Sequence, residues 1–364
     1  MATNVALAAA ERRRRLRAAM AGLGVDALLV TEGDNRRYLS GFTGSSGWLL
    51  IAAGQCLLLT DFRYLTQGAE EAPGVEVVNH GREHELPRCL AERVAALGVK
   101  RLGFESHALS HRVHGILDKA MPGTLVPVEN VVEGLRQVKD AGEVALMRRA
   151  AEIADKAWRQ MCGRLKAGMT ERDAAIELEF IMRREGAEAA AFELIVATGP
   201  RGALPHARPT VRPFKRGDLV VFDFGARVDG YNSDTTRTVV IGEPTAEQRA
   251  MYQAVLDAQA AALELIRAGA SGGDVDAAAR QSLTQAGLGE KFGHGLGHGI
   301  GLAVHEMPYM KPGEQLLLEP GMVFTVEPGV YVPGWGGIRV EDMAHVTEAG
   351  YELLTSSPRE LLAI

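Results

Sequence analysis

Residues 220–240 read VVFDFGARVDGYNSDTTRTVV, in which two arms rich in β-branched and aromatic residues flank an Asp-Gly pair. This composition is typical of a β-hairpin. With Val228 and Asp229 as the loop, Asp223 faces Asp234 with Cβ atoms about 4.5–5.5 Å apart, and a register shift of one or two residues makes them diagonal neighbours. Two facing carboxylates raise each other's pKa unless a cation lies between them. Taken alone, this pair is as compatible with two acids on the exposed face of a hairpin as with a cation site.

Residues 325–343, TVEPGVYVPGWGGIRVEDM, repeat this arrangement further along the chain. Glu327 and Glu341 lie symmetrically about Pro333–Trp335, and apolar, strand-forming residues surround each of them. A free carboxylate is costly to bury in such surroundings. The two hairpins thus supply four acids in converging pairs, and a cluster of cations would balance their repulsion.

A glycine-rich stretch, FGHGLGHGIGLAVH at residues 292–305, precedes the second hairpin. Glycine at every second position predicts a strand that another group can approach closely. The spacing does not fit the GxGxxG pattern of a dinucleotide-binding loop. Histidines are often hydrogen-bonded core residues, but three within this stretch beside four paired acids favour a ligand or acid–base role. Four carboxylates and an imidazole suit Mn, Co, Zn or Fe(II) in a two-metal hydrolytic site, and the oxygen-rich set favours Mn.

Composition and charge narrow the class of protein. The chain has 364 residues, 46% of them hydrophobic, which predicts a globular protein with two domains. Its net charge of −6 argues against a general nucleic-acid binder. Its apolar runs are shorter than the ~20 residues that a membrane helix needs. Three widely spaced cysteines without a CxxC pair predict reduced thiols in a cytoplasmic protein.

The first third of the sequence predicts an α/β domain with helices on a mixed sheet. Its expected elements are helices at Ala9–Leu23 and Glu83–Leu97 and strands at Ala27–Thr31, Tyr38–Phe42, Trp48–Ala52, Cys56–Thr60 and Lys100–Phe104. Proline and glycine in Pro122–Val131 interrupt this alternation, so we place the domain boundary there, giving domains 1–131 and 132–364.

The second domain is expected to be α+β. Apolar residues at helical spacing predict helices at Ala141–Leu165, Thr170–Glu185 and Thr245–Arg267. Each group of helices precedes one of the two acidic hairpins. The pattern of helices followed by a long acidic hairpin therefore occurs twice.

Five short motifs in this domain resemble those of the pita-bread metallopeptidases. Asp223 in FDFG, Asp234 in SDTTRT, His298 in GHGLGHGIG, Glu327 in TVEPG and Glu341 in RVED match that family's five metal ligands in type and order. The family includes methionine aminopeptidase, aminopeptidase P and prolidase. The resemblance implies a pita-bread fold for residues 132–364 and two divalent metal ions, most simply Mn²⁺, with Co²⁺ or Zn²⁺ as alternatives.

The N-terminal segment narrows this resemblance to one branch of the family. Tyr38-Leu-Ser-Gly-Phe-Thr-Gly-Ser45 is similar to the additional N-terminal domain of the proline-specific enzymes, the creatinase/prolidase type. Methionine aminopeptidases usually lack this domain. Creatinases have it but lack the metal ligands, so the five ligands argue against a creatinase.

The resemblance also implies how the ligands divide between the metals. Asp223 and Asp234 would hold one ion, Asp234 and Glu341 would bridge, and His298 with Glu327 would complete the other. A bridging hydroxide would attack the scissile carbonyl. Glu327 would carry the proton to the leaving proline nitrogen.

Residues around the ligands receive roles from the same resemblance. His206, His294 and His305 would line the proline pocket and donate to the oxygen of the tetrahedral intermediate. Tyr331 and Arg339 would orient the metal-binding carboxylates, Asp223 in particular.

Together these observations predict a cytoplasmic peptidase, expected as a homodimer, that cleaves the Xaa-Pro bond of Xaa-Pro dipeptides. Aminopeptidase P acting on longer peptides is the main alternative, and a binding protein that reuses the fold is a distant one. Nucleic acid and membrane are not expected partners.

A dipeptidase needs a cation for the free carboxylate that follows proline. Asn35-Arg36-Arg37-Tyr38 places two arginines before the strand expected at 38–42, and neighbouring residues of an extended chain face opposite ways. At most one of the two can then point toward the catalytic domain. Related sequences more often have an apolar residue at the first of these positions, so the resemblance singles out Arg36 as the residue expected to bind this carboxylate, from its own or a partner subunit. A surface salt bridge with Glu32 or Asp34 is the alternative.

Overall fold

The computed structural model describes residues 2–364 and gives side-chain detail from residue 7 onward. The chain forms two compact units, Met1–Arg136 and Gln137–Ile364. The boundary expected at 131/132 falls at the start of a short helix, Val131–Arg136, that belongs to the first unit.

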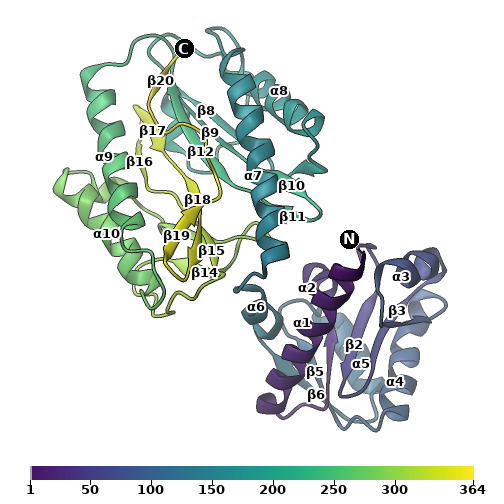
Figure 1. Ribbon diagram of the computed structural model, residues 1–364. Coiled ribbons are helices and arrows are strands. Elements are labelled where there is room, and N and C mark those ends of the chain that lie inside the picture. The colour runs from purple at the N-terminus through teal and green to yellow at the C-terminus, as the bar shows by residue number, and fades with distance from the viewer. Residues whose placement is uncertain (1) are drawn as a thin grey trace. The chain divides into compact units, whose positions relative to one another are not determined.

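The N-terminal unit is a mixed six-stranded sheet of order β4-β3-β2-β1-β5-β6 with helices packed on it (Figure 1). β1 runs parallel to β5 and antiparallel to β2. Its strands are β1 (Ala27–Val30), β2 (Trp48–Ala52), β3 (Cys56–Thr60), β4 (Glu76–Asn79), β5 (Arg101–Glu105) and β6 (Thr124–Val128). Its helices are α1 (Ala2–Leu23), α2 (Gly33–Ser40), α3 (Leu65–Glu71), α4 (Leu86–Ala96), α5 (His111–Ala120) and α6 (Val131–Arg136), with 3-10 turns at Phe62–Tyr64 and Glu83–Glu85.

One predicted element of this unit is wrong. The strand expected at Tyr38–Phe42 is occupied by the end of helix α2 and the turn after it. The side chain of Glu32 accepts a hydrogen bond from the Asn35 backbone N–H and caps the start of α2. Gly41 ends the helix at φ +86°, a left-handed conformation that glycine adopts without steric cost. These local cap signals outweigh the short apolar run that suggested a strand.

The C-terminal unit has four long helices and several small sheets. Three of the helices begin where the sequence predicts, because polar side chains cap their first turns. Asp140 and Thr245 form capping boxes, and Thr170 accepts from the backbone N–H of Asp173. The helices are α7 (Ala141–Cys162), α8 (Glu171–Arg184), α9 (Ala246–Leu263) and α10 (Gly272–Gln285), with 3-10 turns at Gly199–Ala203 and Gly289–Lys291.

Four antiparallel or mixed groups of strands form the sheets of this unit, with orders β11-β10-β7, β20-β12-β9-β8, β14-β13-β15-β18-β19 and β16-β17. The strands are β7 (Ala189–Ala190), β8 (Ile195–Thr198), β9 (Leu219–Phe224), β10 (Ala226–Val228), β11 (Tyr231–Asn232), β12 (Thr235–Val240), β13 (Gly297–Gly299), β14 (Glu306–Met310), β15 (Val323–Val326), β16 (Gly329–Val332), β17 (Gly336–Arg339), β18 (Asp342–Thr347), β19 (Gly350–Leu353) and β20 (Leu362–Ala363).

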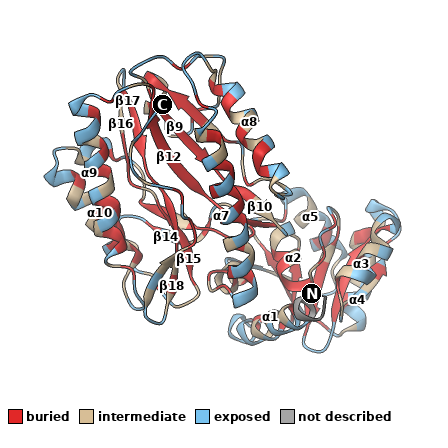
Figure 2. Cartoon of the chain, turned by 45° about the horizontal axis from the view of Figure 1, so that its top comes forward, coloured by how far each residue is buried: buried red, intermediate tan, exposed pale blue. Residues whose placement is uncertain are grey.

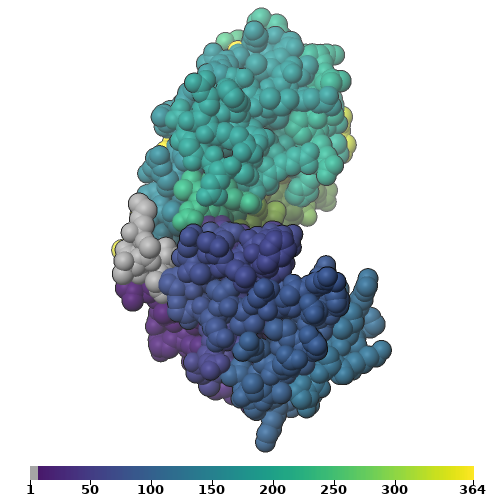
Figure 3. All heavy atoms as spheres, turned by 90° about the vertical axis from the view of Figure 1, so that its right-hand side faces the viewer, coloured from purple at the N-terminus to yellow at the C-terminus, as the bar shows by residue number. Residues whose placement is uncertain are grey.

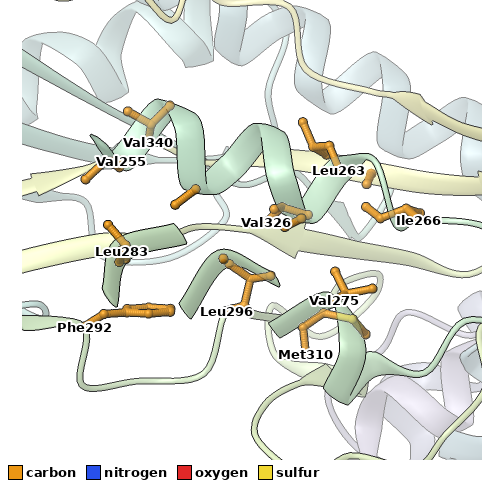
Figure 4. Close-up of a cluster of buried hydrophobic side chains, with 14 of the residues drawn as sticks. Val255, Leu263, Ile266, Val275, Leu283, Phe292, Leu296, Met310, Val326 and Val340 are labelled. Atoms are coloured by element: carbon orange, nitrogen blue, oxygen red, sulfur yellow. The ribbon is translucent and has the colours of Figure 1, made fainter. Parts of the chain in front are cut away.

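Two hydrophobic cores hold the helices against these sheets. One joins α7 and α8 to β8, β9 and β12, with Trp158 against Phe222 and Phe224. The other joins α9 and α10 to the strands that follow them, as Figure 4 shows for Val255 and Val326. The strands thus lie between the two helix pairs (Figure 1), and β9, β12 and β15 are buried along their whole length (Figure 2). Teal atoms of the segment that contains α7 and α8 dominate the face of this unit seen in Figure 3.

The first acidic hairpin, residues 219–240, has a different register from the one expected. Its turn is Asp229-Gly230, with φ +45° and +75°, because Val228 pairs with Tyr231. Asp223 therefore lies opposite Thr236 and not opposite Asp234. Asp223 and Asp234 are therefore diagonal neighbours, and the prediction that they face each other directly was wrong. Asp-Gly is the dipeptide that tolerates positive φ at both turn positions, so it fixes the register two positions from the expected one.

The second acidic hairpin, residues 323–347, keeps the predicted symmetry. β15 pairs with β18 and β16 pairs with β17 in one continuous register, with Val326 opposite Asp342 and Gly329 opposite Arg339. Glu327 and Glu341 lie where the chain leaves the five-stranded sheet for the two-stranded ribbon. Asp234 similarly lies between β11 and β12, where the first hairpin passes between two sheets. In each hairpin, the strands therefore pass from one sheet to another next to the acidic residues.

None of the helices within residues 2–364 is both long and apolar enough to cross a membrane.

Candidate active site

The acids of both hairpins line one cavity of about 550 Å³ in the C-terminal unit. Its size is within the range of small-ligand sites. Every residue predicted as a metal ligand lines it, as do the three other predicted histidines. The predicted residues in its wall are His206, Asp223, Asp234, His294, His298, His305, Glu327, Arg339 and Glu341.

Backbone hydrogen bonds between the hairpins and the glycine-rich strand hold these side chains in place. The Glu341 N–H donates to the Thr236 carbonyl at 3.1 Å, and the Glu327 N–H donates to the Leu296 carbonyl at 2.9 Å. The two glutamates thus hydrogen-bond through their backbones to other segments and not to each other. His298 lies in β13, the short strand that forms in place of the longer one predicted for residues 293–301.

Three of the five predicted ligands form a tight cluster. Oxygen atoms of Asp234 and Glu341 and a ring nitrogen of His298 all lie within 4.8 Å of one another. His298 Nε2 is 3.4 Å from Glu327 Oε1 and 3.8 Å from Asp234 Oδ2. Carboxylate oxygens and an imidazole nitrogen, all of which can donate a lone pair to a metal, therefore lie close together with too few N–H or O–H groups to hydrogen-bond them to one another.

The electrostatics of the cluster fit divalent cations. Burial, and then the neighbouring carboxylates, raise the pKa values of Asp234 and Glu341 well above their ordinary values, and burial also raises the pKa of Glu327. Asp223 Oδ1 and Asp234 Oδ1 are buried with no hydrogen-bond partner among the described residues. Buried polar atoms almost always have a partner. Hard, oxygen-preferring cations would supply both the partner and the missing charge.

Arg339 connects the two hairpins at Asp223. Its Nη2 donates to Asp223 Oδ2 at 2.6 Å, its Nη1 to the Tyr331 hydroxyl at 2.9 Å, and its Nε to Thr236 Oγ1 at 3.0 Å. His294 Nε2 lies 2.9 Å from the same Tyr331 hydroxyl. The structure therefore brings Tyr331 and Arg339 together at Asp223, as the sequence predicts, and adds His294 to the chain of contacts.

Three histidines of the cavity wall, His294, His298 and His305, have lowered pKa values, which favours their neutral forms. Burial, followed by His298 and His206, lowers the pKa of His305 to about 4. Burial also lowers the pKa values of His294 and His298. The ring centroids of His298 and His305 are 4.2 Å apart. A neutral imidazole carries one N–H donor and one acceptor nitrogen, so each can orient a polar substrate group without adding charge.

Arg36 makes its hydrogen bonds within its own unit. It lies in the N-terminal unit on helix α2 and is 6% exposed. Its Nη1 donates to the Gly47 carbonyl at 2.7 Å and its Nη2 to the Gly44 carbonyl at 2.6 Å. These contacts use one N–H of each terminal nitrogen for backbone carbonyls, so they do not support a role for Arg36 in binding a substrate carboxylate, and that role stays a prediction. The structure also gives it no surface salt bridge with Glu32 or Asp34.

Sequence reasoning missed the residues that hold the ligands. The Thr236 hydroxyl donates to Glu341 Oε2 at 2.5 Å, and the Thr325 hydroxyl donates to Glu327 Oε1 at 3.0 Å. Both threonines lie in the quoted motifs, two residues from a predicted ligand. Side chains two apart on a strand share a face, and this spacing is the signal that could have found them.

Arg237 was missed as well. It is 2% exposed and follows Thr236 in β12. Its Nη1 donates to the Glu341 carbonyl at 2.6 Å, and its Nη2 donates to Asp342 Oδ1 at 2.7 Å and to the Ser357 carbonyl at 2.6 Å. It thus ties the first hairpin to the backbone of a predicted ligand in the second.

Comparison with known proteins agrees with this architecture. Residues 145–348 match the model of metallopeptidase family M24, and residues 12–138 match the creatinase/prolidase N-terminal domain. The α+β architecture of the C-terminal unit is the predicted pita-bread fold.

Several relatives span nearly the whole chain. The solved Xaa-Pro dipeptidase from Bacillus anthracis is 40% identical with a TM-score of 0.95, covering 98% of this chain and 100% of its own. The solved X-Pro aminopeptidase from Thermotoga maritima is 38% identical with a TM-score of 0.89, covering 97% and 99%. A Pyrococcus horikoshii protein named Xaa-Pro dipeptidase is 36% identical over 338 residues, 93% of this chain and 95% of that protein. The chain therefore belongs to metallopeptidase family M24, with a creatinase/prolidase-type domain ahead of the catalytic one.

Proposed function

We propose that this protein is a dinuclear-metal peptidase that hydrolyses the Xaa-Pro bond of Xaa-Pro dipeptides. The observation that carries the proposal is the convergence of four buried carboxylates and His298 in one cavity, with two carboxylate oxygens that no described residue satisfies. The names of relatives that align over nearly the whole chain, among them Xaa-Pro dipeptidases, support the substrate class.

In this proposal Asp223, Asp234, His298, Glu327 and Glu341 hold two divalent ions. Bound ions would lower the pKa of water and polarise the scissile carbonyl. The oxygen-rich ligand set favours Mn²⁺, with Co²⁺ or Zn²⁺ as alternatives. Homodimerisation and a cytoplasmic location stay predictions, as does the domain division at 131/132.

The chain's own groups then complete the chemistry. Arg339 and Tyr331 fix Asp223, while the hydroxyls of Thr236 and Thr325 fix the two glutamates. Glu327 would transfer a proton to the leaving proline nitrogen, the general-acid role that the resemblance to the family implies for it.

The remaining histidines act on the substrate. His206, His294 and His305 line the same cavity, and N–H donors there would stabilise charge on the carbonyl oxygen as it becomes tetrahedral. The domain pair and the cavity are equally compatible with aminopeptidase P activity on longer peptides, and the likeness to the Thermotoga maritima enzyme supports that second candidate.

One experiment separates the two candidates. The purified protein is stripped with chelator and reloaded with Mn²⁺, and metal content is measured together with kcat/KM for Leu-Pro and Leu-Pro-Gly. We expect two ions per chain and a higher kcat/KM for Leu-Pro. A preference for Leu-Pro-Gly would favour aminopeptidase P, and hydrolysis of neither would contradict the proposal.

A further inference from the structure

The cavity wall contains three permanently or normally charged cations among the described residues, namely Arg339, Arg208 and Lys311. A dipeptide differs from a longer peptide in the carboxylate directly after its second residue. If the proposed function holds, a cation in this wall distinguishes the two substrates by charge. Which of the three can do so depends on how their donors are already used.

Arg339 uses four of its five N–H donors inside the protein. Its Nη2 donates to Asp223, its Nη1 to both the Tyr331 hydroxyl and the Pro205 carbonyl, and its Nε to Thr236. It is 3% exposed. Turning it toward a substrate would break the contacts that fix a metal ligand.

Arg208 is paired and strongly solvated. Its Nε lies 3.4 Å from Glu193 Oε2, and its side chain is 83% exposed. A carboxylate reaching Arg208 would have to compete with both Glu193 and water. Ion pairs in such exposed positions contribute little free energy.

Lys311 differs from both arginines. It directly follows β14, and its Nζ lies 5.0 Å from the centre of the Tyr309 ring. Its side chain is 54% exposed, less than that of Arg208, and its Nζ forms an ion pair with Glu314 Oε2 at 3.8 Å, beyond hydrogen-bond length. No hydrogen bond from its Nζ to another described residue is present. A substrate carboxylate that reaches this ammonium group would therefore compete with one long ion pair and would break no hydrogen bond.

The backbone around Lys311 places it next to the site. A Cβ added to Gly295 would lie 3.1 Å from Lys311 Cβ and 3.0 Å from the Met310 carbonyl. Gly295 directly follows His294, which lines the cavity and contacts Tyr331. The absence of a side chain at Gly295 thus lets the segment that carries Lys311 pack against the histidine segment.

We propose that Lys311 binds the free C-terminal carboxylate of the dipeptide and makes the enzyme prefer Xaa-Pro to extended substrates. The inference rests on the proposed function, since it assigns a specificity-determining residue to that cavity. An N⁺–H···O⁻ hydrogen bond forms only when proline is the last residue of the substrate. The Tyr309 ring lies beside the lysine and limits the positions of its ammonium group.

The test compares Leu-Pro with Leu-Pro amide, which has the same size but no C-terminal charge. In the metal-loaded enzyme, Lys311→Met should lower kcat/KM for Leu-Pro about tenfold, the low end for a hydrogen bond to a charged group. It should leave the amide within about twofold of wild type. Lys311→Arg should retain most of the preference for Leu-Pro, and Lys166→Met, at an exposed position outside the cavity, serves as the matched control.

The outcomes separate this inference from the proposed function. If wild type hydrolyses both substrates and Lys311→Met changes them equally, or changes neither, the assignment of Lys311 is overturned while the peptidase proposal stands. The same conclusion follows if Arg208→Met removes the preference and Lys311→Met does not. If metal-loaded wild type hydrolyses neither substrate, the proposed function itself fails.

Discussion

The two acidic hairpins supply the same number of carboxylates but hold them differently. In the second hairpin Glu327 is fixed by Thr325 of its own strand, and Glu341 by Thr236 of the first hairpin. In the first hairpin Asp223 is fixed by Arg339 of the second, and one oxygen of each aspartate has no partner among the described residues.

This difference shows that neither hairpin forms the site by itself. The polar contacts that orient Asp223 and Glu341 come from the opposite hairpin, so the site exists only when both halves of the unit are folded together. The aspartates carry the unsatisfied oxygens and the glutamates carry most of the hydroxyl support. We therefore expect substitutions in the two hairpins to have different effects on metal binding and stability.

The largest effect is expected from Asp223→Asn. The amide keeps the shape of the side chain and can still accept from Arg339, but it removes a negative charge that balances a cation. Activity should fall about 10³-fold or more, because the bound ions supply several kcal/mol of transition-state stabilisation. Metal content and kcat/KM test this prediction, with circular dichroism as the control for folding. Two bound ions and normal turnover would show that Asp223 is not a ligand.

Arg237→Met tests the connection between the hairpins. It would leave the carbonyl groups of Glu341 and Ser357 without their buried donor, while Asp342 would keep its contacts with Gln259, Thr355 and Arg359. We therefore expect the free energy of unfolding to fall by about 1–3 kcal/mol for each unsatisfied carbonyl. Urea unfolding measures this change. Arg249→Met is the matched control, since Arg249 is 59% exposed and pairs only with an exposed Glu243. Equal effects of the two substitutions would mean that Arg237 does not hold the hairpins together.

His305→Ala addresses the wall of the cavity and not the ligands. If His305 donates to the oxygen of the intermediate, kcat should fall about 10²–10³-fold, while metal content stays at the wild-type value. His206→Ala is measured in parallel, because His206 lines the same cavity but precedes both hairpins in the sequence. Loss of metal from the His305 variant would mean that a ligand had been mistaken for a substrate-binding group.

The smallest effect is a pH dependence of the metal-free protein. Burial and neighbouring carboxylates raise the folded-state pKa values of Asp234 and Glu341 above their ordinary values of 3.8 and 4.5. The folded chain then binds more protons than the unfolded chain between those two sets of pKa values. The stabilisation is complete below the ordinary values and is lost as pH rises through the folded ones, by about 1.4 kcal/mol per pH unit for each proton.

The Tm of chelator-treated protein should therefore fall as pH rises above the ordinary carboxyl pKa values of 3.8 and 4.5. Asp234→Asn removes one of these groups, so the metal-free variant should be more stable than metal-free wild type at pH 8 and have a shallower slope. Added Mn²⁺ should raise the Tm of wild type at pH 8 but not that of the variant. Identical slopes for the two metal-free proteins would contradict the raised pKa of Asp234.

Local sequence signals predicted much of this architecture. Apolar residues at helical spacing located the helices that begin near Thr170 and Thr245, and the structure shows that both side chains cap these helices by bonding to backbone groups three residues away. Motif order identified the family, and the symmetric spacing of Glu327 and Glu341 matched their register in the second hairpin. The predicted register of the first hairpin was wrong because moving the turn by one residue, from 228–229 to 229–230, moves the residue opposite Asp223 by two positions, from 234 to 236.

By itself the sequence determined the types of chemistry-bearing residues, their order along the chain and the helices with clear caps, since these depend on neighbours within a few residues. Tertiary structure decided which N–H donors of the basic side chains are hydrogen-bonded inside the protein and which are available to a substrate. Arg36 and Lys311 are both basic residues beside glycine-containing segments, yet one is buried with two carbonyl partners and the other faces the cavity. A hydrogen bond between residues more than 100 positions apart, such as that of Arg339 with Asp223, follows from how the sheets pack and leaves no periodic trace in the sequence.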